Sequence, residues 1–170
     1  RGRAHRERGP PARRAEDRIV TVQSVIAALA SVEALITGLS TGQCFDATPD
    51  TIETSLPVCI NVIDRGSIER SAGEGYRRTI HTIQAQLLCA EPGTDLPTAE
   101  TIARPYVAKF ISKLDTNRSL AGTCIDSEVT GYEYREIRLS ESSPGYLGIV
   151  FSIDATEEET GAMLFLSTSA

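Results

Sequence analysis

Histidine and cysteine are the side chains best suited to chemistry in this chain of 170 residues, and there are few of them. His5 lies in a basic stretch, whereas His81 shares a strand face with Ile83 and Ala85, which favours a structural role over that of a general base. The cysteines are widely spaced and form no C-x-x-C pair, so the sequence does not predict a zinc site. We expect four reduced thiols packed as small core residues, at Cys44, Cys59, Cys89 and Cys124.

Motifs for other cofactors are incomplete. The segment GEG at residues 73–75 has Arg78 where a dinucleotide fingerprint needs its third glycine, and it precedes a predicted strand rather than a helix. Asp154 and the glutamates at 157–159 lack the turn glycine of a calcium loop, and we expect a solvated acidic strand end. The sequence therefore predicts no catalytic residues, no cofactor and no metal ion, and we do not expect an enzyme.

The net charge of −6 is unevenly distributed along the chain. Residues 1–18 hold seven Arg and three acidic residues, a net +4, whereas residues 19–170 hold 10 basic and 20 acidic residues, a net −10. We expect residues 1–18 to be a flexible basic arm, or an extension encoded upstream or by a vector, ahead of a single α+β domain over 19–170. The acidic body disfavours nucleic-acid binding, and no segment reaches the roughly 18 apolar residues of a membrane span.

Hydrophobic periodicity predicts two helices, over residues 21–37 and about 97–116. Gly38 follows the first helix as a stop signal. Pro105, inside the second, predicts a kink or a break near Arg104. Between the first helix and the first strand, residues 39–57 are expected to form a long loop.

Four strands are predicted, over residues 58–64, 76–89 and 123–139 and in the segment that follows the turn at 143–145. The third is one long strand or two shorter ones broken at Gly131. The last alternates most clearly, and its apolar face consists of Leu147, Ile149, Phe151 and Ile153. Its other face, with Gly148, Ser152 and Asp154, is expected to be open to solvent or to a neighbouring subunit.

The predicted order is helix, strand, strand, helix, strand, strand. Because each strand alternates on one face only, we expect an α+β fold in which an antiparallel four-stranded sheet carries both helices on one face.

This order, together with several segments, resembles the tail terminator (tail completion) proteins of long-tailed bacteriophages. The resemblance covers roughly residues 21–155. It depends on the aliphatic first helix and on the segments LPVCINVI, YRRTIHTIQAQLLC, Leu120–Thr123 (LAGT) and SPGYLGIVFSIDA. The chain departs from the family in its basic arm, in Pro105 and in the tail after Thr160.

The resemblance implies a structural virion protein that forms a homo-hexameric ring on the tail tube. Such a ring ends tube polymerisation and joins the tail to the neck of the head, after assembly in the host cytoplasm. The implied partners are the tail tube protein and a head-neck connector protein. DNA would pass through the ring without sequence-specific binding, and the family carries no catalytic residues.

Four arginines near the connection between the first two strands are the candidate protein interface: Arg65, Arg70, Arg77 and Arg78. They stand out on an acidic body, and buried arginines often concentrate binding energy at interfaces. The simpler interpretation is that they are solvated side chains of a flexible loop. Three other functions stay open: a different head-tail neck adaptor ring, a small-ligand binding module, and an enzyme that uses His81 with a nearby acid.

Overall fold

The computed structural model describes residues 21–70 and 76–160. The basic segment 1–18, the centre of the glycine-rich connection at 71–75 and the tail at 161–170 lie outside the described residues.

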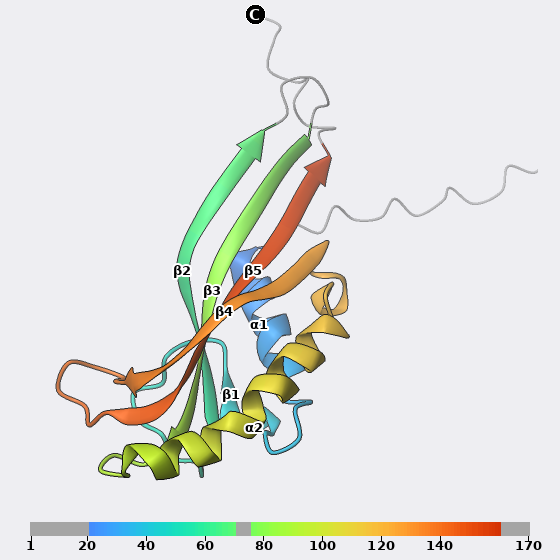
Figure 1. Cartoon of the computed structure of the whole chain (residues 1–170). Helices are drawn as coiled ribbons and strands as arrows, with labels where there is room; N and C mark the ends of the chain where they lie inside the picture. The colour runs from blue at the N-terminus through green and yellow to red at the C-terminus, as the bar shows by residue number, and fades with distance from the viewer. Residues whose placement is uncertain (1–20, 71–75, 161–170) are drawn as a thin grey trace, which may run out of the picture.

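The described chain forms two helices, two short 3-10 turns and one five-stranded sheet (Figure 1). The helices are α1 (Val22–Glu33) and α2 (Leu96–Asp115), and the turns are η1 (Thr41–Gln43) and η2 (Leu120–Gly122). The strands are β1 (Cys44–Phe45), β2 (Val58–Arg70), β3 (Tyr76–Ala90), β4 (Asp126–Ile137) and β5 (Tyr146–Thr160). They lie in the order β1-β2-β3-β5-β4.

The α+β class is confirmed, but the predicted antiparallel four-stranded sheet is wrong. Strand β1 adds a fifth, parallel strand in which Cys44 pairs with Cys59 and Phe45 with Ile60. The other neighbouring strands pair antiparallel. The sequence could not indicate β1, because two residues are too few to show an alternation and they lie in a segment punctuated by Gly42 and Pro49.

Both helices pack on one face of the sheet, as expected. The ring of Phe110 in α2 stacks on that of Phe151 in β5, with centroids 4.1 Å apart and planes 6° apart. Val25, Ile26 and Leu29 of α1 belong to the same buried cluster. The alternation in β5 is therefore interpreted correctly, and its apolar face builds the core.

The opposite face is not as open as the sequence suggested. Val58, Ile60, Leu88, Ile137 and Val150 form a second buried cluster there, and Ile52 and Leu56 of the loop before β2 pack against it. Gly148 is buried at this end of the sheet, whereas Ser152 and Asp154 are half-buried. The expectation of a solvated face fails because a loop without regular structure can still cover apolar side chains.

The helix boundaries differ modestly from the expected ones. Helix α1 begins after Thr21, whose side chain accepts a hydrogen bond from the backbone of Ser24, and it ends at Glu33, before the predicted residue 37. Helix α2 is continuous through Pro105, and Figure 1 shows it bent, so of the two predicted outcomes the structure agrees with the kink and not with the break. A proline removes one backbone donor, which bends a helix but need not end it.

The strands are longer than the apolar pattern predicted. Strand β2 continues to Arg70 instead of ending near residue 64, and β5 continues to Thr160. Strand β4 is one strand, with a register shift between Val129 and Gly131 instead of a break. Polar residues that are paired only through the backbone leave no hydrophobic alternation to read.

As a result, three strands extend past the helices (Figure 1). We call this end of the sheet the projection; it comprises Asp64–Arg70 of β2, Tyr76–Thr82 of β3 and Asp154–Thr160 of β5. At its base Ala155 still belongs to the buried core. Strand β1 reaches only to Ile60 of β2, and β4 pairs with β5 only up to Thr156.

Candidate protein interface

All four predicted arginines lie in the projection. Arg65 and Arg70 belong to β2, Arg77 and Arg78 belong to β3, and Arg70 is directly opposite Arg77 in the register. Arg65 is exposed, whereas Arg77 and Arg78 are half-buried. These positions are strand rather than flexible loop, so the structure corrects the simpler interpretation.

The acidic end of β5 lies beside these arginines. The register places Glu158 opposite Arg78 and Glu159 opposite Arg77. Arg78 Nη2 lies 3.2 Å from Glu158 Oε2, in a pair whose side chains are 39% and 32% exposed. Two runs of opposite charge at the ends of antiparallel strands can be brought into register, so the arginines at 77–78 and the glutamates at 157–159 were a signal for this pairing.

His81 lies on the helix-side face of the projection. Its Nε2 is 3.3 Å from Glu157 Oε2, within ion-pair distance but without the geometry of a hydrogen bond, and the side chains are only 14% and 12% exposed. The structure thus brings the histidine near an acid, as the enzyme alternative requires. The same arrangement also agrees with a structural role, since each of the two side chains covers the other on the surface of the sheet.

A small hollow lies elsewhere, between α2 and the strands β4 and β5. Leu96, Ala103, Tyr134 and Leu147 contribute to its lining, and its volume is about 120 Å³. Pockets for small ligands usually measure about 300–1,000 Å³. The hollow therefore gives little support to the ligand-binding alternative, and His81 does not line it.

A buried polar cluster joins α1 to β2, and sequence reasoning missed it. Asn61 Nδ2 donates hydrogen bonds to Glu33 Oε2 at 2.7 Å and to the Phe45 carbonyl at 3.2 Å. Burial raises the pKa of Glu33 from 4.5 to about 8, although hydrogen bonds from Asn61 and Cys59 act to lower it. The sequence pattern does indicate that Glu33 is buried, because it continues the apolar stripe of Ile26, Leu29 and Ala30 at helical spacing.

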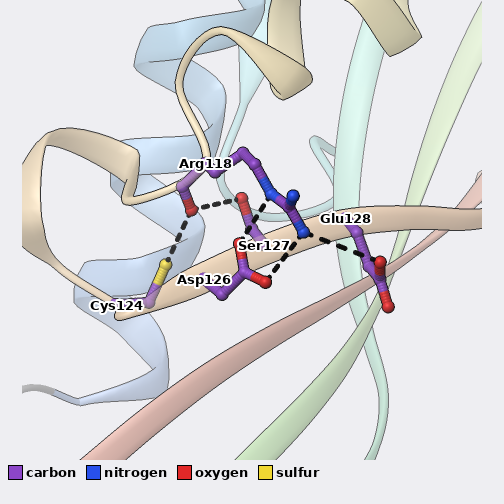
Figure 2. Close-up of polar contacts among 5 residues, drawn as sticks. All are labelled: Arg118, Cys124, Asp126, Ser127 and Glu128. Carbon is purple, nitrogen blue, oxygen red and sulfur yellow. Dashed lines mark hydrogen bonds and ion pairs between the residues drawn. The ribbon is translucent and has the colours of Figure 1, made fainter.

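A second polar cluster ties the end of α2 to the start of β4 (Figure 2). Arg118 approaches Asp126 with two nitrogens, at 2.7 and 2.8 Å, and Glu128 at 3.8 Å. Its carbonyl oxygen accepts hydrogen bonds from Ser127 Oγ at 2.7 Å and from Cys124 Sγ at 3.5 Å. These contacts are satisfied within one connection, so the cluster positions β4.

Three of the four cysteines lie in the core, as predicted, and the fourth lies at its margin. Cys59, Cys89 and Cys124 are buried, Cys44 is half-buried, and all four are free. Burial raises the pKa of Cys44 and of Cys89 to about 12.

Comparison with protein-family models gave no match, and neither did comparison with curated proteins. Within residues 21–70 and 76–160, no group of three or more His, Cys, Asp or Glu side chains could hold a metal ion. In the same part of the chain, no helix is both long enough and apolar enough to cross a membrane.

Proposed function

We propose that this chain is a structural subunit of a phage tail, which caps the tail tube as a ring of six copies, ends tube polymerisation and joins the tail to the neck of the head. Its partners are then the tail tube protein and a neck connector protein. It acts in the virion after assembly in the host cytoplasm, and DNA passes through the ring without sequence-specific contact.

The observation that carries the proposal is the projection. Three strands extend beyond the helix-covered body, and all four candidate arginines lie on them. A surface that reaches away from its own core is suited to contact a partner, and charged groups on such a surface favour specificity and register. The resemblance of the sequence to tail terminators supplies the class of partner.

The described chemistry agrees with a structural role better than with the alternatives. The His81–Glu157 pair lies on the sheet surface, apart from the hollow between α2 and β4. The buried carboxyl group of Glu33, at the end of α1, faces Asn61 of β2 within the fold. Neither arrangement forms an accessible cleft that would hold a substrate against a reactive group.

Tail length in a phage that encodes this chain tests the proposal. Deletion of the gene is expected to give tails of irregular length that do not join heads. Uniform tails detached from heads would instead indicate a neck adaptor ring, and normal particles would refute both structural functions.

The interface can be tested by charge removal with a matched control. Arg77→Gln with Arg78→Gln removes two positive charges from the projection without creating repulsion against the glutamates of β5, and we expect loss of tube capping. Arg104→Gln with Arg138→Gln removes two exposed charges outside the projection, and we expect normal capping. Equal capping by the two folded variants would refute the arginine site while leaving the wider function to the deletion experiment.

A further inference from the structure

The outer edge of β2 in the projection is a bare strand edge. On its inner side β2 pairs with β3 up to Arg70. On its outer side β1 reaches only Ile60, and no other strand of the described chain pairs there. The backbone of residues 64–70 therefore offers hydrogen-bonding groups to a further strand, and such an edge is a template for pairing with another chain.

The charges along this edge are ordered. Asp64 and Arg65 precede three uncharged residues, 66–68, and Glu69 and Arg70 follow them. A second copy laid antiparallel, with Ser67 of each copy on a two-fold axis, places Arg65 opposite Glu69. Asp64 lies at the register shift between Ile63 and Arg65, at the end of this pairing, and comes level with Arg70. Opposite charges across a pair of strands stabilise it, and like charges destabilise it.

Among the neighbouring pairings of the two strands, only this register places opposite charges across from each other. A shift by one residue places Asp64 opposite Glu69, or Arg65 opposite Arg70 when the shift is in the other direction. A parallel in-register pair places every charge opposite its own kind. The edge is thus complementary to itself in one antiparallel arrangement, which is the requirement of an isologous interface.

The faces of the strand agree with this pairing. Arg65 and Glu69 are exposed and stand in register with Thr82 and Arg78 of β3, so both lie on the face away from the helices. On the other face the same arrangement places Ile68, which is 59% exposed, opposite Gly66. Glycine has no side chain, so the isoleucine has room to cover the neighbouring backbone.

We propose that the free protein forms a two-fold dimer by antiparallel pairing of residues 64–70 of β2 with the same residues of a second copy. This inference depends on the register and charge of β2, and not on the proposed tail function. If both hold, the dimer and the tube-bound ring use the same strand and exclude each other, because Arg65 and Arg70 belong to both surfaces.

A charge exchange tests the pairing directly. By symmetry the dimer contains the Arg65–Glu69 contact twice, so Arg65→Glu alone or Glu69→Arg alone creates two like-charge contacts. We expect each variant to dimerise at least about tenfold more weakly than the unsubstituted protein, as measured by sedimentation equilibrium. Circular dichroism and urea unfolding establish that each variant is folded.

Two experiments in which dimerisation should be restored distinguish this contact from a general effect of charge. The double variant R65E/E69R restores opposite charges and is expected to dimerise like the unsubstituted chain. An equimolar mixture of the two single variants is expected to form a heterodimer, because each supplies the charges that the other lacks. The proposal is overturned if the single variants dimerise as tightly as the unsubstituted protein. It is also overturned if both the double variant and the mixture stay monomeric, or if the unsubstituted protein is monomeric at its highest soluble concentration.

A disulfide tests the register. In the proposed dimer the two Ser67 Cα atoms lie about 4.5–5.5 Å apart, within the roughly 4.4–6.8 Å that a disulfide spans. Ser67→Cys is therefore expected to give a covalent dimer on mild oxidation. The control Glu69→Cys places its two thiols four residues apart along the strands, roughly 13 Å, and should not cross-link. Cross-linking at 69 but not at 67 would overturn the register.

Discussion

At the scale of single residues, the side chain with the largest expected effect is Glu33, which the sequence analysis did not single out. Glu33 continues the apolar stripe of α1 and is buried against Asn61 and Cys59. Its pKa is raised to about 8 because burial disfavours the carboxylate. The fold therefore holds a proton at this site through the neutral range.

This proton makes stability depend on pH. A carboxyl group whose pKa is raised in the folded state stabilises the fold fully below its unfolded pKa, and the contribution is lost as the pH rises through the folded value. For Glu33 the window runs from about 4.5 to about 8. At about 1.4 kcal/mol per pKa unit, the free energy of unfolding should fall by roughly 4 kcal/mol across it.

Glu33→Gln should remove this dependence, because the amide has no proton to lose in this range. We expect the variant to be more stable than the unsubstituted protein at pH 9 and to show a flatter profile from pH 5 to 9 in urea unfolding. Glu91→Gln, at an exposed position, is the matched control and should keep the original slope. An unchanged slope in the Glu33 variant would show that the carboxyl group ionises without cost.

Phe151 tests the core at the same scale. Its side chain is fully buried and stacks on Phe110, so Phe151→Ala should lower the free energy of unfolding by about 3–5 kcal/mol. Phe151→Asp should prevent folding, because the new charge has no partner in the core. A cooperative thermal transition in the Asp variant would mean that this face of β5 tolerates water.

At the scale of elements, the sequence predicted the helices and strands that bury an apolar face. Strands β3 and β5 and helix α2 bury one face each, so their apolar spacing gave their positions to within a few residues. The projection has little such signal, because its strands carry polar and charged residues such as Arg65, Thr79 and Glu157. Strand β1 is too short to show a period at all.

The candidate site was located only in part. The four arginines lie on neighbouring strands, but the register puts Arg65 and Arg78 on one face of the sheet and Arg77 on the other. The contact of Arg78 with Glu158 of β5 depends on a pairing that spans 80 positions of the chain. Long-range pairing of this kind is set by the sheet as a whole, which the local pattern of either strand does not specify.

Strands β3 and β5 leave no room for a side chain at Gly148 in β5. A Cβ there would collide with the backbone carbonyl of Leu87 in β3, whose carbon would be 2.9 Å away. Gly148→Ala should therefore force the strands apart and lower the free energy of unfolding by about 3 kcal/mol or more.

Gly131 in β4 is the matched control, because a Cβ there meets no described atom within 4 Å. Gly131→Ala should be neutral or stabilise the strand by up to about 1 kcal/mol. Urea unfolding of the two variants gives the comparison, and equal losses in both would indicate that strand entropy, and not the contact with β3, controls the effect.

At the scale of the whole molecule, the two proposals make one joint prediction about assembly. The described body is covered by helices on one face and by a loop on the lower part of the other, whereas residues 64–69 of β2 in the projection are exposed. Subunits therefore have their most open surface where both the tube and a second copy would bind. Because one strand serves both contacts, the larger ring should form only when a tube competes with the dimer.

We expect light scattering to give a dimer for the purified protein over a concentration series, with no larger species, and electron microscopy to show rings once preformed tubes are added. The E69R variant separates the two states, since it should be monomeric in solution by loss of the dimer contact while it keeps all four candidate arginines. Rings of the unsubstituted protein in the absence of tubes would contradict the exclusion between the two contacts. A protein that stays dimeric beside uncapped tubes would remove the support for tube capping while leaving the β2 pairing in place.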